Sequence, residues 1–248
     1  MTNALIDGDI ILYRSCAAVE TDARWDEDTH VLSSNAQEAF DLFELTLVKI
    51  MEKLGTGKVR LAFTKGTCFR SDIYPAYKQT RVNNRKPLCF AEVRARAEAT
   101  YEAYSYPGLE ADDVLGIWAT RGDGVIVSED KDLKTIPCRL LRQGEFSTIT
   151  EAEADYWFMY QTLTGDTTDG YPGCPGIGPK KAEAILAFEY DGDWLPQAWP
   201  RVVAAYEKAG LDEDAAITQA RLARILRASD WDAKKKEVIL WQPPRTPK

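Results

Sequence analysis

The stretch Ala4-Leu5-Ile6-Asp7 decides the fold. It is a short apolar run that ends on a carboxylate, as a buried parallel strand does when a functional residue lies at its C-terminal end. Two further runs of this kind follow, Val59-Arg60-Leu61-Ala62-Phe63 and Gly124-Val125-Ile126-Val127-Ser128, and we expect each to form a strand.

Helical patterns lie between these expected strands. Asn35 with Glu38 suggests a capping box, apolar residues follow at helical spacing, and Gly55 closes the segment. Residues 91–103 and 111–121 are also expected to be helical. Strands that alternate with helices predict an α/β fold with a mostly parallel central sheet flanked by helices. Ligands bind such sheets beyond the carboxyl ends of the strands, so we expect Asp7 and Asp130 to meet there.

The pattern changes after about residue 151, where strand signals stop and helical patterns dominate. A Gly/Pro-rich stretch from Gly165 to Pro179 interrupts them, and helices are expected around 180–190, 198–209 and 213–228. We therefore divide the chain into a first region, 1–155, and a helical second region, 156–248.

Composition excludes several classes of function. The 248 residues, 45% hydrophobic, are ample for a packed core. No run approaches the roughly 20 apolar residues of a membrane span, and the first residues do not resemble a signal peptide, so we expect a cytoplasmic protein without a membrane partner. The single histidine, His30, lies in a polar stretch, and we expect it to be solvated. The five cysteines lack zinc or redox spacing and are expected to be buried or free thiols: Cys16, Cys68, Cys89, Cys138 and Cys174.

Acidic residues gather in four short groups. Glu110 and Asp113 lie at the start of the expected helix at 111–121. They project on one face of that helix because they are three residues apart. Carboxylates that converge in a cleft cannot all stay ionised without cations, and all-oxygen ligands favour Mg²⁺ or Mn²⁺ over zinc. The alternative for any one group is a helix cap or a turn, and for Asp166 to Asp169 alone that alternative is favoured. The four groups are Asp7-Gly8-Asp9, Glu110-Ala111-Asp112-Asp113, Asp130-Lys131-Asp132 and Asp166-Thr167-Thr168-Asp169.

Three segments occur in the order and approximate spacing of the flap endonuclease and 5′→3′ exonuclease family, which has a PIN-like nuclease core and a helix–hairpin–helix. They are Gly108-Leu109-Glu110-Ala111-Asp112-Asp113, Val127-Ser128-Glu129-Asp130-Lys131-Asp132-Leu133 and Gly165-Asp166-Thr167-Thr168-Asp169. The resemblance runs from Asp7 to about Ile185. The compact size and the ending Ala223-Arg224-Ile225-Leu226-Arg227-Ala228-Ser229-Asp230-Trp231 resemble stand-alone bacteriophage exonucleases of this family.

The resemblance implies a site with two or more divalent ions. Asp7, Asp113 and Asp130 would also be catalytic. Asp9 lies outside the family motif, so a solvated or capping role is as plausible. Where many members have an Asp after the second strand, this chain has Thr64, which removes one charge from the site. The implied ligands are Asp7, Glu110, Asp112, Asp113, Asp130, Asp132, Asp166 and Asp169.

A basic stretch suggests a phosphate-binding surface. Residues 58–96 contain ten Lys and Arg against two acidic residues. The net charge of −8 does not argue against such a surface. Once the eight implied ligands are set aside, the other 31 of the 39 acidic residues equal the 31 Lys and Arg in number. The segment 69–81 resembles the family's approach to a helical arch, expected at about 70–108. By this resemblance Lys78 and Arg81 reach the scissile phosphate, Arg70, Arg85 and Lys86 contact DNA, and Tyr74 and Tyr77 either stack on a base or pack internally.

The glycine-rich segment Gly173-Cys174-Pro175-Gly176-Ile177-Gly178-Pro179-Lys180-Lys181 reads as a turn that opens a helix. Glycines let backbone amides approach a phosphate, and a helix N-terminus adds positive potential. The segment resembles the family's helix–hairpin–helix, which grips duplex DNA, often with a bound K⁺. Gly176, Gly178, Lys180 and Lys181 would then contact DNA.

The resulting hypothesis is a structure-specific 5′ nuclease of DNA replication and repair that releases 5′-phosphorylated products. Its partner is DNA with a 5′ end, nick or flap, or RNA in a hybrid, and no obligate protein partner is evident. One alternative is a haloacid-dehalogenase-type phosphatase with Asp7 as nucleophile, which leaves Glu110 to Asp113 and the hairpin unexplained. The other is a non-catalytic DNA-binding module, favoured only if Thr64 abolishes metal binding.

Overall fold

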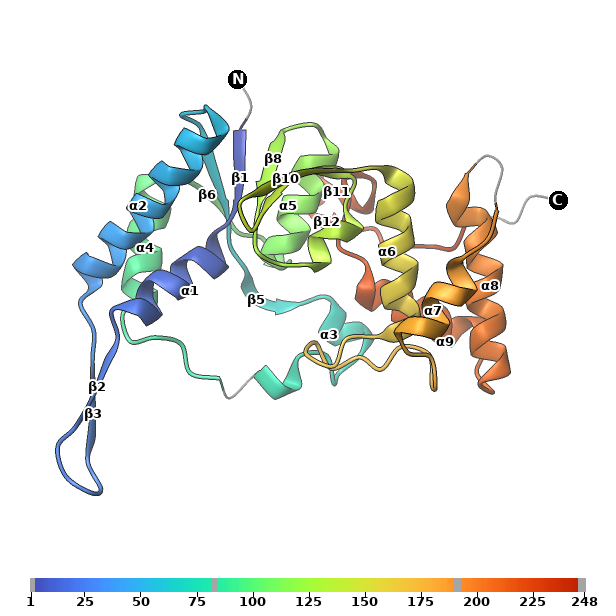
Figure 1. Ribbon diagram of the computed structural model, residues 1–248, viewed down its shortest axis with the longest axis horizontal. Coiled ribbons are helices and arrows are strands. Elements are labelled where there is room, and N and C mark those ends of the chain that lie inside the picture. The colour runs from blue at the N-terminus through green and yellow to red at the C-terminus, as the bar shows by residue number, and fades with distance from the viewer. Residues whose placement is uncertain (1–2, 82–83, 190–192, 245–248) are drawn as a thin grey trace.

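A computed structural model describes residues 3–81, 84–189 and 193–244. A six-stranded sheet of order β10-β9-β8-β1-β4-β6 lies at its centre (Figure 1). Neighbouring strands are parallel except for β9 and β10, which form an antiparallel edge. The fold is therefore the expected α/β type with a mostly parallel sheet. The strands are β1 (Asn3–Asp7), β4 (Val59–Ala62), β6 (Glu102–Tyr104), β8 (Gly124–Val127), β9 (Cys138–Arg142) and β10 (Glu145–Ile149).

The alternation of side chains along β1 builds a hydrophobic core on each face of the sheet. Ala4 and Ile6 pack with the helices on one face, whereas Leu5 packs toward α5 (Ala111–Thr120) on the other. The helices of the first face lie together at the left of Figure 1. They are α1 (Gly8–Ala18), α2 (Ala36–Leu54) and α4 (Phe90–Thr100).

The ends of α2 follow from its sequence. The Asn35 side chain accepts hydrogen bonds from the N–H groups of Gln37 and Glu38. Gly55 ends the helix in the left-handed region, with φ of 61°. The expected start and end of this helix are confirmed.

The second region is mainly helical (Figure 1, right), and its core also includes Cys68 and Tyr77 of the first region. Its last helix ends at Ala223 rather than near 228, because Arg224 is extended and a 3-10 turn follows at Ala228–Asp230. The expectation that strands stop after 151 is wrong in one place, where β11 (Trp231–Asp232) pairs with β12 (Glu237–Val238). The helices are α6 (Glu151–Thr164), α7 (Pro179–Leu186), α8 (Trp194–Lys208) and α9 (Glu213–Ala223).

Smaller elements connect these layers. β2 (Thr21–Arg24) and β3 (His30–Ser33) form an exposed ribbon that projects from the sheet domain (Figure 1). Between residues 70 and 108, apart from 82–83, the structure contains α3 (Arg70–Ile73), a 3-10 turn at Gln79–Arg81, α4 and β6. β5 (Lys65–Cys68) pairs with β7 (Pro107–Gly108) across this segment. The expected regions 1–155 and 156–248 also include residues 1–2, 190–192 and 245–248, which lie outside the described residues.

Three expectations from composition can be compared with this fold. All five cysteines are free and buried, as predicted. His30 is exposed and lies 3.2 Å from Asp22, so the prediction of a solvated side chain is confirmed. Within the described ranges, each helix is too short or too polar to cross a lipid bilayer.

Candidate active site

The order of the strands brings the first carboxylates together. β1 and β8 are parallel neighbours, so Asp7 at the end of β1 lies beside the segment that follows β8. Ser128 donates a hydrogen bond of 2.9 Å to Asp7 Oδ2 and its hydroxyl oxygen accepts the N–H of Asp130. The expectation that chain-distant carboxylates meet at this edge of the sheet holds.

Two adjoining cavities collect the remaining carboxylates. A smaller one of about 180 Å³ and a larger one of about 500 Å³ share a wall made by Lys78, Glu110, Asp112 and Asp130. The acidic side chains of the two cavities come from four separate segments of the chain, around residues 7, 110–112, 130–132 and 166–169. Together the cavities are lined by seven of the eight predicted ligands: Asp7, Glu110, Asp112, Asp130, Asp132, Asp166 and Asp169.

Several of these carboxyl groups are buried close to other carboxyl groups, which disfavours their negatively charged forms. Burial, reinforced by the charges of Asp9 and Asp130, raises the pKa of Asp7 to about 7. Burial and the charges of Asp7 and Asp130 raise the pKa of Asp112 well above its ordinary value. Burial and the charges of Asp130, Asp166 and Asp169 raise the pKa of Asp132 to about 6. A divalent cation between these groups would remove the repulsion and return them to the ionised form.

Two other carboxyl groups already have cationic partners. Burial alone would raise the pKa of Glu110, but the charges of Arg70 and Lys78 outweigh it and lower the pKa. Burial opposes ionisation at Asp166 too, yet hydrogen bonds from the N–H groups of Asp169 and Thr168, together with Lys131, lower its pKa. Asp166 thus organises the local turn, as the capping alternative expected, while it also lines the smaller cavity.

Lys78 and Arg81 lie on the wall of the cleft. The Lys78 ammonium is 2.5 Å from Glu110 Oε1 and 3.4 Å from Asp169 Oδ2. Arg81 Nη2 is 2.6 Å from Asp169 Oδ1. The backbone of Lys78 has a φ of 54°, and its N–H donates to the carbonyl of Asp169, which fixes the side chain beside the carboxylates. Both cations line the two cavities described above.

Asp113 does not belong to the cleft. Its carboxylate has no exposed surface and lies outside both cavities. Arg70 donates to both of its oxygens, at 2.7 and 2.9 Å, and the N–H groups of Glu110 and Leu226 donate to them at 3.1 Å. Asp113 thus forms a buried ion pair with Arg70, an arrangement that favours a structural role, while its expected roles as metal ligand and catalytic residue stay predictions.

Arg70 is the partner of Asp113. Its side chain is only 3% exposed, and its guanidinium also reaches Glu110 and the carbonyls of Leu222 and Arg224. It also lines the smaller cavity. These internal acceptors favour a structural role for Arg70, and its expected phosphate contact stays a prediction.

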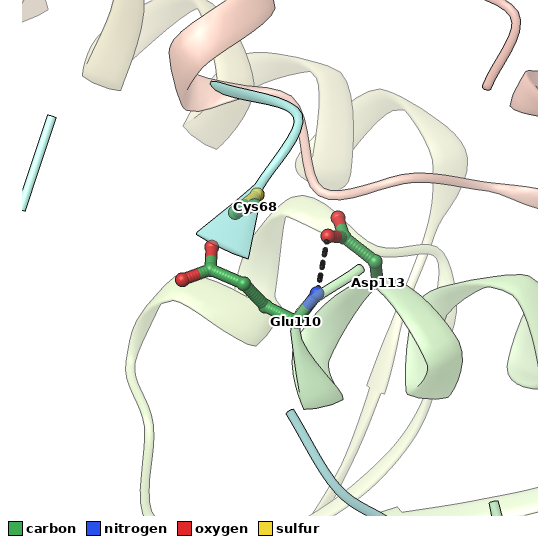
Figure 2. A group of neighbouring side chains, drawn as sticks. All are labelled: Cys68, Glu110 and Asp113. Carbon is green, nitrogen blue, oxygen red and sulfur yellow. Dashed lines mark hydrogen bonds between the residues drawn. The ribbon is translucent and has the colours of Figure 1, made fainter. Parts of the chain in front are cut away.

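Figure 2 shows a second place where ligand atoms converge, formed by Cys68, Glu110 and Asp113. Their sulfur and oxygen atoms lie within 4.8 Å of one another, a spacing that fits a metal ion. The guanidinium of Arg70 already fills this position, with Nη1 3.0 Å from Cys68 Sγ, 3.2 Å from Glu110 and 2.9 Å from Asp113. In this structure, Cys68, Glu110 and Asp113 therefore bind the guanidinium of Arg70.

The other predicted DNA contacts lie on the surface. Arg85 pairs with Glu20, and Lys86 lies over the ring of Phe90. Tyr77 is buried and its hydroxyl donates to Glu110 and Asp169, so packing rather than base stacking describes it.

The glycine-rich turn precedes α7 as the sequence suggested. Gly176 has a φ of 75°, and the space around its Cα and that of Gly178 is open. Lys180 and Lys181 are exposed in the first turn of α7, where Lys181 donates to the carbonyl of Gly176. This places two lysines and two accessible glycine backbones on one surface.

Sequence reasoning missed two residues of the cleft. Lys131 lies 3.7 Å from Asp132 and 3.4 Å from Asp166, and its position between two predicted ligands could have revealed it. Gln161, from the interior of α6, donates to Asp132 Oδ1 at 2.5 Å. No local pattern singles out this glutamine, because the fold alone brings α6 to the cleft.

A mostly parallel sheet whose strand ends gather buried carboxylates beside basic side chains defines a nuclease-type site. Residues 2–155 match the model of the 5′-3′ exonuclease, N-terminal resolvase-like domain. The chain therefore belongs to the 5′-3′ exonuclease family, and this assignment sets the phosphatase alternative aside.

Individual proteins support the same assignment. The exodeoxyribonuclease of Enterobacteria phage T3 is 31% identical over an alignment 281 residues long. This alignment covers 96% of this chain and 92% of that protein. The exonuclease of Escherichia phage T7 is 31% identical over 278 residues, with 96% and 93% covered. The fold is similar to that of the bacteriophage T5 flap endonuclease in a complex with DNA and metal ions. That comparison has a TM-score of 0.62 at 14% identity and covers 90% of this chain and 89% of the T5 chain.

Proposed function

We propose that this protein is a metal-dependent 5′→3′ exonuclease and flap endonuclease that hydrolyses DNA phosphodiester bonds to 5′-phosphorylated products. The observation that carries the proposal is the pair of adjoining cavities lined by seven of the eight predicted ligands, with Lys78 and Arg81 in the wall. The phage T3 and T7 relatives, named exodeoxyribonuclease and exonuclease and matched over nearly their whole length, support the same activity.

The donor set fits two hard divalent ions, Mg²⁺ or Mn²⁺. Asp7, Glu110, Asp112 and Asp130 would hold an ion at the larger cavity, whereas Asp132, Asp166 and Asp169 would hold another at the smaller one. Oxygen ligands of this kind match the preference of Mg²⁺. Such ions supply an activated water and stabilise the charge that develops on the attacking and leaving oxygens.

The chain's own cations complete the chemistry. In the ion-free arrangement, Lys78 and Arg81 neutralise Glu110 and Asp169. With divalent ions bound to the carboxylates, Lys78 and Arg81 would contact the scissile phosphate and stabilise its transition state. The same residues thus balance the cleft at rest and act on the substrate.

Binding of the duplex is assigned to a separate surface. Gly176 and Gly178 expose backbone to the solvent, and Lys180 and Lys181 add charge at the start of α7. We include a K⁺ ion at this turn in the proposal. Arg85 and Lys86 would extend the contact on the other side of the cleft. The catalytic core would comprise 1–155, with an arch at about 70–108, and the duplex-binding region 156–248.

The free, buried thiols support a reducing compartment, and we place the protein in the cytoplasm, that of a bacterial host if a phage encodes it.

The test is to incubate 5′-labelled duplex, nicked and flap DNA, and an RNA–DNA hybrid, with the protein in Mg²⁺ or in EDTA. We expect Mg²⁺-dependent products with 5′-phosphates, and none from the Asp112→Asn variant. A protein that binds these substrates but cuts none of them in Mg²⁺ or Mn²⁺ would be a non-catalytic DNA-binding module.

A further inference from the structure

The strand β4 lacks the acidic end that its neighbours have. β1 ends at Asp7, and Asp130 follows β8, but β4 is followed by Phe63 and Thr64. The Thr64 hydroxyl accepts the N–H of Ala111 at 3.1 Å and so caps the start of α5. Thr64 therefore contributes a helix cap and no charge to this part of the cleft.

A carboxylate from another element lies beside the end of β4. Asp9, in the first turn of α1, accepts the N–H of Thr64 at 2.8 Å through Oδ2. It lines the larger cavity together with Asp7, Asp112 and Asp130. Its other oxygen, Oδ1, lies 3.8 Å from Arg94, a long ion pair between partly exposed side chains. Because exposed pairs of this kind contribute little to stability, the Arg94 contact does not account for a carboxylate here.

We propose that Asp9 is a further residue of the metal site, whose carboxylate brings from α1 the negative charge that the end of β4 lacks. This inference rests on the proposed function. Oδ2 accepts the Thr64 N–H, while Oδ1 accepts no hydrogen bond from the described residues and keeps its accepting capacity beside the cavity that Asp9 lines. Asp9 acts on the hydrated divalent ion from outside its ligand shell, by accepting hydrogen bonds from the ion's water molecules and by its charge.

The test measures Mn²⁺ binding by the full, metal-free chain, by isothermal titration calorimetry and by electron paramagnetic resonance of free Mn²⁺. Asp9→Asn keeps the size of the side chain and an oxygen for the Thr64 N–H, so only the charge is lost. We expect the Mn²⁺ affinity of Asp9→Asn to fall about tenfold, since partners behind the direct ligands typically contribute 10- to 100-fold. Its melting temperature in EDTA is expected to stay within about 2 °C of wild type, because the lost ion pair is long and partly exposed to solvent.

Two matched variants separate this role from an ordinary ion pair. Arg94→Gln removes the other half of the pair, and its Mn²⁺ affinity is expected to equal or exceed that of wild type. In the Asp9→Asn/Thr64→Asp double variant, the new carboxylate at the end of β4 can still cap Ala111, and we expect Mn²⁺ affinity to return to within about threefold of wild type.

Unchanged Mn²⁺ affinity in Asp9→Asn would overturn the inference, and so would an equal loss in Arg94→Gln. Failure of Thr64→Asp to restore binding would overturn the claim that Asp9 replaces a charge at β4. These outcomes are distinct from failure of the proposed function, in which the wild type itself neither binds Mn²⁺ nor cuts DNA and both proposals fall.

Discussion

Asp112 and Asp113 are adjacent in the sequence, but we expect opposite consequences from replacing each by Asn. The Asp113 carboxylate is fully buried and accepts four hydrogen bonds, two of them from the Arg70 guanidinium. In Asp113→Asn the amide group would face these donors, and Arg70 would lose its buried counter-charge. Breaking one side of a buried ion pair costs about 3–5 kcal/mol of the free energy of unfolding.

That cost gives a measurable shift. For a chain of this size, each kcal/mol moves the melting temperature by about 2–4 °C, so Asp113→Asn should melt roughly 6–20 °C below wild type. Asp112 has a raised pKa and no hydrogen-bond partner among the described residues. The metal-free Asp112→Asn variant should therefore be at least as stable as wild type, because the substitution removes repulsion from Asp7 and Asp130.

The assay pairs thermal melting in EDTA with Mn²⁺ titration at about 10 °C, where both variants remain folded. Asp113→Asn should melt early and bind Mn²⁺ nearly as wild type does, whereas Asp112→Asn should melt normally and lose Mn²⁺ binding. If Asp113→Asn instead melts with wild type and loses the metal, then Asp113 is a ligand, as the sequence predicted, and its structural role is refuted.

Three other predictions concern charge. The pKa values of Asp7 and Asp132 are raised to about 7 and 6, so the folded metal-free protein retains protons that the unfolded chain releases above about pH 4. The melting temperature of the metal-free protein should therefore fall as the pH rises from about 5 to about 8. A melting temperature that rises over this range would contradict the raised pKa values. At saturating DNA and Mg²⁺, Lys78→Ala should lower the single-turnover cleavage rate by about 10² to 10³, and a change in affinity alone would leave Lys78 a mere backbone contact. Replacing Lys180 and Lys181 by Ala should lower the slope of log affinity against log salt by about 0.9 for each lost phosphate contact, with turnover at saturation preserved; an unchanged slope would leave the turn a helix opening only.

The sequence was informative where burial leaves a local pattern. β1, β4 and β8 are buried strands, and their apolar runs revealed them before their order in the sheet was known. β10 gave no such signal, because four of its five residues are exposed and its pairing with β9 supplies the stability. Neighbour order is likewise set by long-range packing, which no window of sequence contains.

The same limit applied to the site. Adjacent helical residues differ in direction by about 100°, so Asp112 faces the cleft while Asp113 turns into the protein. The partner that marks Asp113 as structural is Arg70, 43 residues earlier in the chain. Composition had identified both as acidic residues at a functional edge, and only the fold could separate them.

Arg70 gives the cleft a cation that neither dilution nor a chelator can remove. Its guanidinium is fixed by Asp113 and Glu110 on one side and by the carbonyls of Leu222 and Arg224 on the other, so it also ties the end of α9 to the start of α5. Withdrawal of divalent ions is therefore expected to stop the chemistry without separating the two regions. The apoprotein would remain folded but inactive. Its activity would return when divalent ions are added back, because no refolding step is needed.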